Sequence, residues 1–195
     1  TSFLSAAGST TLGYTSLTNA NCNLIEAHGT PEQIAKWVVP MRQGRFAGTM
    51  AMTEPSAGSG LADLATSATR TEEGRYLITG NKIFISGGDH NLSENIVHLV
   101  LARIKGAPKG IKGVSLFIVP KYLVDETGAV GSRNDVSLAG LFHKMGGRGQ
   151  TSCAINFGEQ GGSIGYLVGE ENQGIRYMFH MMNEARIMVG TSAAL

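Results

Sequence analysis

Eight short segments with a two-residue apolar period fill the middle of the chain, and they restrict the fold more than any other feature. They are 46–53, 65–70, 75–79, 82–86, 95–104, 114–119, 136–142 and 151–157. Turns that contain Gly, Asn or Asp separate them, and no segment with helical spacing lies between them. This pattern predicts strands in an antiparallel barrel or sandwich rather than a parallel α/β sheet. The pair Gly80-Asn81 predicts a hairpin turn between two of these strands.

Helical signals precede this middle stretch. Residues 2–28 are rich in small side chains, which predicts a closely packed helix. Thr30, Pro31 and Gln33 form a capping box with Pro at the first helical position, so a second helix is expected to begin there. Pro40 is expected to end it, because proline disrupts a helix interior.

A third helix is expected after Glu170, where the period becomes helical again. The apolar residues that share one face at about 100° per residue are Ile175, Met178, Phe179, Met182, Ala185 and Val189. The chain stops at Leu195 with this pattern unfinished, which we interpret as a truncated domain. The fold class is therefore an α+β multidomain fragment. A β-barrel-like domain over 46–168 is flanked by helical pieces over 1–45 and 169–195.

Charge and composition exclude several classes of function. The net charge of +1 comes from scattered Lys and Arg, so no basic patch for nucleic acid is expected. The longest apolar runs are only as long as strands, so no membrane span is expected. Cys22 and Cys153 form no metal-type or CxxC pair, which indicates a reducing, cytoplasmic location. No other residues show the spacing of metal ligands.

Two glycine-rich segments raise the question of a ligand. Residues 161–165 fit the GxSxG pattern of hydrolases but lack the strand before it and the helix after it, so we interpret them as a plain glycine turn. The segment MTEPSAGSG, residues 52–60, ends a strand in a loop with almost no side chains. It is either a tight turn or a backbone that lets a ligand approach closely. Taken alone, it favours neither.

Its companions downstream favour the ligand. AMTEPSAGSG and ITGNKIFISGG together resemble the acyl-CoA dehydrogenase family, whose middle β-domain carries a TEP-x-AGSD loop and a W-I-[ST]-x-G strand end. Three further segments are similar to family segments and follow the family's order. They are HGTPEQIAKWVVPMRQGRFAG, HKMGGRGQTSCAINF and VGEENQGIRYMFHMMNEAR. FGEQGGSIGYLVGEENQG and MMNEAR look closest to a long branch of the family, the 3-methylmercaptopropionyl-CoA dehydrogenase-like proteins.

The resemblance implies an FAD site at two strand ends. The implied cofactor-binding residues are Met50, Met52, Thr53, Gly58, Ser59, Phe84, Ile85 and Ser86. In the family, the hydroxyls matching Thr53 and Ser86 contact the polar edge and the N5 region of the isoalloxazine ring, and the residue matching Ser59 also approaches the acyl-CoA. Two departures matter: Phe84 replaces the usual Trp, and Gly60 replaces the usual Asp.

The last helix supplies a second candidate. Arg186 projects into the apolar stripe, where a buried guanidinium needs an anionic or carbonyl partner, unless it extends from the stripe's edge to solvent. The matching family Arg lies near the acyl-CoA, so Arg186 is an implied substrate-binding residue. Glu184 projects to the opposite face and is expected to be solvated. Some members place their catalytic base where this chain has Ala185, so we expect no catalytic residue here and a base beyond Leu195.

The implied reaction is FAD-dependent removal of hydrogen from Cα and Cβ of an acyl-CoA thioester, which gives a 2-enoyl-CoA. The resemblance also implies an electron-transfer flavoprotein as partner and a homo-oligomer, a dimer or a tetramer. A flavin acyl-CoA oxidase would share every motif. A non-catalytic relative that binds protein or nucleic acid is a further alternative, which the absence of a basic patch disfavours.

Overall fold

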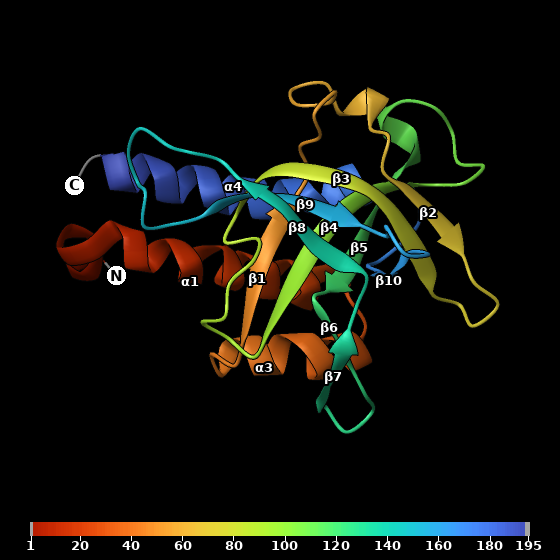
Figure 1. Cartoon of the computed structure of the whole chain (residues 1–195), viewed down its shortest axis with the longest axis horizontal. Helices are drawn as coiled ribbons and strands as arrows, with labels where there is room; N and C mark the ends of the chain where they lie inside the picture. Colours follow the sequence, from red (N-terminus) through yellow and green to blue (C-terminus); the bar gives the residue numbers. More distant parts are fainter. Residues whose placement is uncertain (1, 194–195) are drawn as a thin grey trace.

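Helices cover one side of a β-barrel in the computed structural model, which describes residues 2–193 and the side chains of 13–191 and 193 (Figure 1). The helical segments are α1 (Ser2–His28), α2 (Pro31–Gln33), η1 (Ile34–Val38), α3 (Val39–Arg42), η2 (Leu61–Asp63), η3 (Ile111–Gly113) and α4 (Gly174–Ala193). The strands are β1 (Phe46–Ala51), β2 (Ser67–Arg70), β3 (Tyr76–Ser86), β4 (Asn95–Ile104), β5 (Val114–Pro120), β6 (Tyr122–Val124), β7 (Val130–Arg133), β8 (Val136–Leu141), β9 (Ser152–Phe157) and β10 (Ser163–Leu167). The assignment of the flanking helices to two separate domains stays a prediction.

Five strands close the barrel. The antiparallel pairs β4–β5, β5–β10, β10–β3 and β3–β2 follow one another around it, and β2 returns to β4 through a short parallel pair. β1 extends β4 in parallel, and β9 and β8 extend β3. The predicted barrel is confirmed. Its two parallel pairs, β1–β4 and β2–β4, differ from the fully antiparallel arrangement that the sequence predicts.

The predicted hairpin at Gly80-Asn81 is wrong, because β3 runs through both residues as one strand. Its first half pairs with β2 and β10, and its second half pairs with β9. A Cβ at Gly80 would lie 2.4 Å from Oγ1 and 2.8 Å from Cα of Thr66. The glycine therefore serves a close approach of two backbones rather than a turn.

The plain glycine turn predicted at 161–165 is also wrong in part, because Ser163 begins β10, the strand that closes the barrel. A Cβ at Gly165 would lie 2.8 Å from Cγ1 of Ile78 on the neighbouring strand. Here glycine gives room for a packed side chain across the sheet. The hairpin of β6 and β7, which pairs Tyr122 with Arg133, was likewise absent from the prediction.

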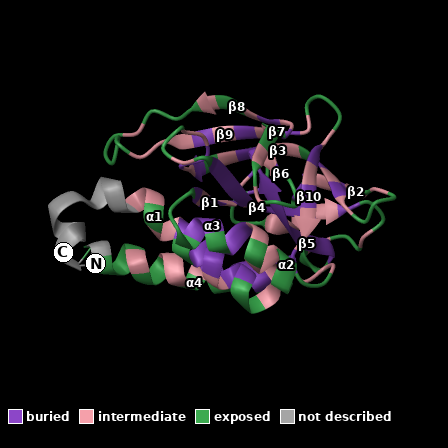
Figure 2. Cartoon of the chain, turned by 90° about the horizontal axis from the view of Figure 1, so that it is seen from below, coloured by how far each residue is buried: buried purple, intermediate pink, exposed green. Residues whose placement is uncertain are grey.

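Two apolar cores lie on opposite faces of β4. Leu99 and Leu101 pack in the core that includes Leu24 and Trp37 of the helices, whereas Val100 packs in the barrel interior. Successive side chains of a strand point to opposite faces, so a strand between two cores is apolar at almost every position. Figure 2 shows this layering, with buried residues where α1, α3 and α4 meet the strands.

The helices before the barrel follow their sequence signals with one exception. α1 ends at His28, and the capping box of Thr30 and Gln33 is present. The segment does not end at Pro40 but continues to Arg42. A π-helical turn precedes the proline, and in it the N–H of Val39 donates to the carbonyl of Ile34, five residues back. The wider turn makes room for the proline ring, which would clash in a regular α-helix.

Candidate functional site

The loop after β1 is both a tight turn and an open backbone. Glu54 and Ala57 exchange two backbone hydrogen bonds, from N to O at 2.9 and 3.2 Å. Gly58, Ser59 and Gly60 are exposed beyond this turn. A Cβ at Gly60 would meet no atom within 4 Å, and one at Gly58 would meet only Thr53 Cγ2, at 4.0 Å. A ligand can therefore reach the backbone of residues 58–60, as the second interpretation of the sequence requires.

An ion pair lies under this loop in the protein interior. Lys82 Nζ donates to Glu54 Oε1 at 2.9 Å and to the Met52 carbonyl at 3.0 Å. The Glu54 carboxylate also accepts the N–H groups of Ala65 and Thr66, at 2.7 and 3.0 Å. The side chains of Lys82 and Glu54 are 0% and 3% exposed. No sequence signal pointed to this pair, because its members are not close in sequence.

The charges and hydrogen bonds within the pair favour its ionised form. Burial lowers the pKa of Lys82 to about 8, against the opposing effect of the Glu54 charge. Burial raises the pKa of Glu54, but the charge of Lys82 and hydrogen bonds from Thr66, Lys82 and Ala65 outweigh it, so the net pKa is lowered. Two charges thus remain in the interior, with hydrogen bonds that satisfy them.

Phe84 lies at a bulge in β3. Lys82 pairs with Ile155 and Ile85 with Cys153, so two residues of β3 oppose one residue of β9. Phe84 has φ +59°, and the residue is 57% exposed. A bulge redirects a side chain, and a bulky residue at positive φ stores strain that is typical of functional sites. The position that the resemblance assigns to the flavin is thus the strained one.

The bulge adjoins the bare loop and an aromatic neighbour. The Ile83 N–H donates to the Thr53 carbonyl at 2.9 Å, which fixes the end of β1 beside β3. The ring centroids of Phe84 and Phe142 are 4.6 Å apart. Ile85, by contrast, is 2% exposed, with its side chain in the barrel core. Ile85 is therefore not available to a ligand in this arrangement, in contrast to its neighbour Phe84.

The end of β3 meets the loop between β8 and β9. Ser86 pairs with Ser152, and the Gly87 N–H donates to the Thr151 carbonyl at 3.0 Å. The Tyr14 hydroxyl on α1 accepts the Thr151 N–H at 3.1 Å. The buried Thr151 Oγ1 has no hydrogen-bond partner among the described residues. A hollow of about 150 Å³ opens here, lined by Leu141, Phe142, His143, Lys144, Arg148, Gln150, Thr151 and Ser152.

A second hollow, of about 360 Å³, lies between the end of β1 and α4. It is lined by Met50, Met52, Met182, Ala185, Arg186 and Val189. Of the two interpretations of Arg186, burial is wrong: the residue is exposed, and its guanidinium donates to Asn183 Oδ1 at 2.9 Å. The structure nevertheless brings Arg186 to the same hollow as Met50 and Met52.

The buried face of α4 matches the predicted one only in part: Met178 of the predicted stripe is buried, and Ile175 and Met182 pack against the core. Tyr177, Met178 and Met181 are buried, whereas Phe179 and Val189 of the predicted stripe are 45% and 64% exposed. α4 is apolar on two faces, and a single projected stripe cannot say which one meets the core. The spacing of Tyr177, Met178 and Met181 is the signal that marks the second face.

Glu184 is hydrogen-bonded to α1 and only partly solvated, which corrects the expectation from sequence. Its two carboxylate oxygens accept hydrogen bonds from Asn23 Nδ2 at 2.9 and 3.0 Å. His180 Nε2 lies 3.6 Å from one of them. Asn23 Oδ1 in turn accepts from Arg42 at 2.6 Å. Glu184 therefore does not line the hollow that Arg186 lines.

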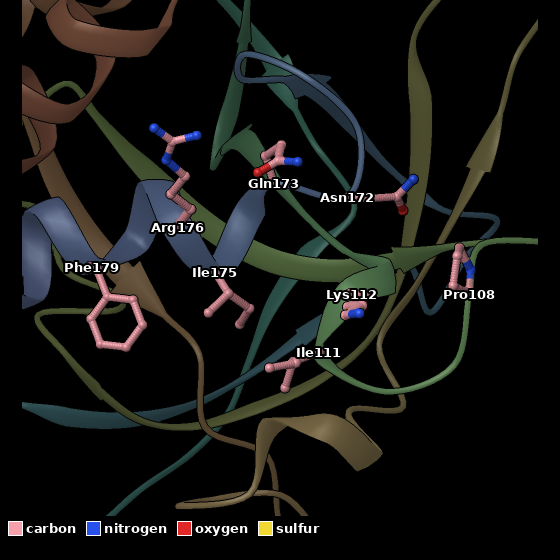
Figure 3. Close-up of a pocket in the computed structure, with 8 residues that line it drawn as sticks. All are labelled: Pro108, Ile111, Lys112, Asn172, Gln173, Ile175, Arg176 and Phe179. Carbon is pink, nitrogen blue, oxygen red and sulfur yellow. The ribbon is translucent and has the colours of Figure 1, made fainter.

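A wider hollow, of about 750 Å³, lies at the start of α4 (Figure 3). Its lining residues are Pro108, Ile111, Lys112, Asn172, Gln173, Ile175, Arg176 and Phe179. Figure 3 shows Ile175 and Phe179 on the side of α4 that faces Ile111, while Arg176 projects to the other side. The buried Asn172 Oδ1 has no partner in the described structure. None of the predicted site residues lines this hollow, and no sequence signal links its two segments.

The acyl-CoA dehydrogenase middle-domain family matches residues 49–159, from the end of β1 to the turn after β9. The chain belongs to the acyl-CoA dehydrogenase family. This confirms the resemblance that the motifs carried. Within the described helices, none is sufficiently long and apolar to cross a membrane.

Relatives of this acyl-CoA dehydrogenase chain extend well beyond its length. 3-Methylmercaptopropionyl-CoA dehydrogenase of Ruegeria pomeroyi is 47% identical over 89% of the chain, which spans 29% of that protein. Butyryl-CoA dehydrogenase from Megasphaera elsdenii matches 93% of the chain with a TM-score of 0.70 and 26% identity, and the chain covers 43% of it. Acyl-CoA dehydrogenase of Bacillus anthracis, solved with FAD, matches 85% with a TM-score of 0.67 and 25% identity, and the chain covers 26% of it.

Proposed function

We propose that this chain supplies the flavin-facing and thioester-facing walls of an enzyme that converts an acyl-CoA to a 2-enoyl-CoA. The observation that carries the proposal is the junction of β1 and β3. There the bare loop 58–60 and the strained, exposed ring of Phe84 are joined by the bond from Ile83 to Thr53. Membership of the acyl-CoA dehydrogenase family supports the same reaction.

The residues present fit FAD. The carbonyls of Met52 and Thr53 are already occupied by Lys82 and by the Ile83 N–H. The hydroxyls of Thr53 and Ser86 have no such bond within the described residues, so they are the groups that would contact the polar edge of a flat ring. Phe84 would pack beside the ring, and Gly58 and Ser59 leave room for a close approach. FAD held by these residues would supply the acceptor for the hydride that leaves Cβ.

The thioester is proposed to lie along the exposed face of α4. Met50, Met52 and Met182 offer an apolar wall near Arg186, and Ser59 of the bare loop is a second contact. The 750 Å³ hollow at the start of α4 would bind the nucleotide end of the CoA. Lys112 and the amide groups of Asn172 and Gln173 would be its hydrogen-bond donors. A rise of 1.5 Å per residue separates residues 175 and 186 by roughly 16 Å, a span suited to an extended thioester.

The base that removes the Cα proton is proposed to lie outside this chain. Glu54 is bonded to Lys82 in the interior, and Glu184 is bonded to Asn23 on the far side of α4 from the hollow. Position 185, where some family members place the base, is alanine. The chain's own residues would then bind and orient the substrate, and fixed donors would stabilise the enolate that develops.

The experiment uses the full-length protein that contains this chain. Bound FAD is measured by absorbance, and acyl-CoA is added with an artificial electron acceptor and then with oxygen alone. Turnover only with the acceptor supports a dehydrogenase, whereas rapid oxygen uptake favours an oxidase. Protein without flavin that binds DNA would overturn the proposal. We further propose that an electron-transfer flavoprotein is the electron acceptor and that the full-length protein is a dimer or tetramer. A cytoplasmic location is a separate proposal.

A further inference from the structure

The interior ion pair of Glu54 and Lys82 holds backbone from three separate segments. Lys82 Nζ bonds the Met52 carbonyl, and Glu54 bonds the N–H groups of Ala65 and Thr66. Glu54 itself opens the tight turn, and Lys82 immediately precedes the bulge at Phe84. The pair therefore lies where the bare loop and the strained aromatic residue meet.

Stability alone is a poor explanation for this pair. Removing two charges from water is costly, and replacing a buried ion pair by neutral residues of similar volume is often neutral or stabilising. Glu54 and Lys82 are 3% and 0% exposed, so they bear this cost nearly in full. Charged groups with directed hydrogen bonds define where each backbone segment lies, which apolar side chains of the same volume do not.

We propose that Glu54 and Lys82 are positioning residues for the flavin site, an inference that rests on the proposed function. Lys82 fixes the carbonyl of Met52, so the next residue, Thr53, is held at the mouth of the loop. Lys82 also fixes β3 at the start of the bulge. The same ammonium therefore fixes the position of the backbone that carries Phe84. Glu54 locks the ammonium in place by bonding it and the 65–66 backbone together.

The test compares two neutralised ion pairs in the full-length protein. Glu54→Gln with Lys82→Met removes the interior charges at nearly constant volume. Arg45→Met with Glu94→Gln removes an exposed pair, whose Nη2–Oε2 distance is 2.6 Å, and serves as the matched control. We expect the interior double variant to fold, to bind FAD at least tenfold more weakly and to shift the flavin absorbance bands. The control should leave the affinity and the spectrum unchanged.

A second variant covers the case in which the double variant does not fold. Glu54→Asp keeps both charges, but its shorter carboxylate cannot bond Lys82 and both N–H groups of residues 65 and 66 together. We expect a threefold or larger loss of FAD affinity with a shifted flavin spectrum. Wild-type affinity and spectrum in either interior variant would overturn the positioning role alone. Absence of FAD binding by the wild-type protein would overturn the proposed function, and this inference with it.

Discussion

At the scale of single residues, two side chains occupy costly positions for different reasons. Phe84 adopts φ +59° at a bulge although the residue is 57% exposed, so beyond its contact with Phe142 little packing offsets its strain. His98 is fully buried on β4, where Nδ1 lies 2.7 Å from Thr49 Oγ1 and Nε2 has no partner among the described groups. Phe84 lies on the surface that we assign to the flavin, whereas His98 lies in the interior.

Replacing Phe84 separates strain from ligand binding. Phe84→Gly and Phe84→Ala both remove the ring, but only glycine adopts positive φ freely. We expect the glycine variant to be more stable than the alanine variant by about 1–2 kcal/mol, the cost of a left-handed conformation. Urea unfolding of both variants measures this difference. Equal stabilities would show that the bulge relaxes when the ring is lost, so that no strain is stored there.

His98 predicts a pH dependence of stability. Burial lowers its pKa from 6.5 to about 3; the charge of Asp89 raises the pKa by a smaller amount, and that of Lys121 lowers it further. The unfolded chain binds the proton more tightly, so stability is fully present above pH 6.5 and is lost as the pH falls toward 3.

From pH 7 to 4.5 this loss is roughly 2–3 kcal/mol. In His98→Gln, which keeps an acceptor for Thr49, the decrease should be smaller by that amount. Unfolding free energies at both pH values measure it. Equal losses of unfolding free energy in the wild-type protein and in His98→Gln would contradict the assignment of this pH dependence to His98.

At the scale of elements, the sequence predicts the features that depend on local patterns and misses those that depend on long-range contacts. Period-two alternation located most strands, and the capping box located α2, because both signals lie within a few residues. The closure of β2 on β4 and the continuous path of β3 depend on Gly80 meeting Thr66, which no local pattern shows. The site divides in the same way. Thr53, Phe84 and Ser86 came from family motifs, whereas Lys82, 28 residues from Glu54, gave no signal.

The contact of α4 with α1 gives a prediction at this scale. Glu184→Ala leaves Asn23 Nδ2 without its acceptor, which should loosen the docking of α4. A half-exposed charged hydrogen bond contributes about 1 kcal/mol, so amide exchange within α4 should become roughly fivefold faster. Hydrogen exchange of residues 178–184 measures this. Glu72→Ala, in an exposed turn, is the control, and equal rates in both variants would remove Glu184 from the docking contact.

At the scale of the whole molecule, apolar surface is concentrated on the parts that carry the candidate site. Ile187 and Val189 of α4 are 71% and 64% exposed, and Leu141 at the end of β8 and Met145 after it are 61% and 97% exposed. Exposed apolar patches of this kind mark interaction surfaces. The chain spans 29% of its Ruegeria pomeroyi relative, so we expect further protein to cover these faces in the complete enzyme.

Residues 1–195 alone are therefore expected to bind FAD weakly and to leave acyl-CoA unoxidised. Neither Glu54 nor Glu184 is free to act as the base, and the apolar face of α4 has no cover that would exclude water from the site. The uncovered face should instead drive self-association. Flavin absorbance after gel filtration, an acyl-CoA assay with an artificial electron acceptor and sedimentation velocity measure the three properties. A monomer with stoichiometric FAD and turnover would place the base within these residues and contradict our assignment of Glu54 and Glu184 to structural roles.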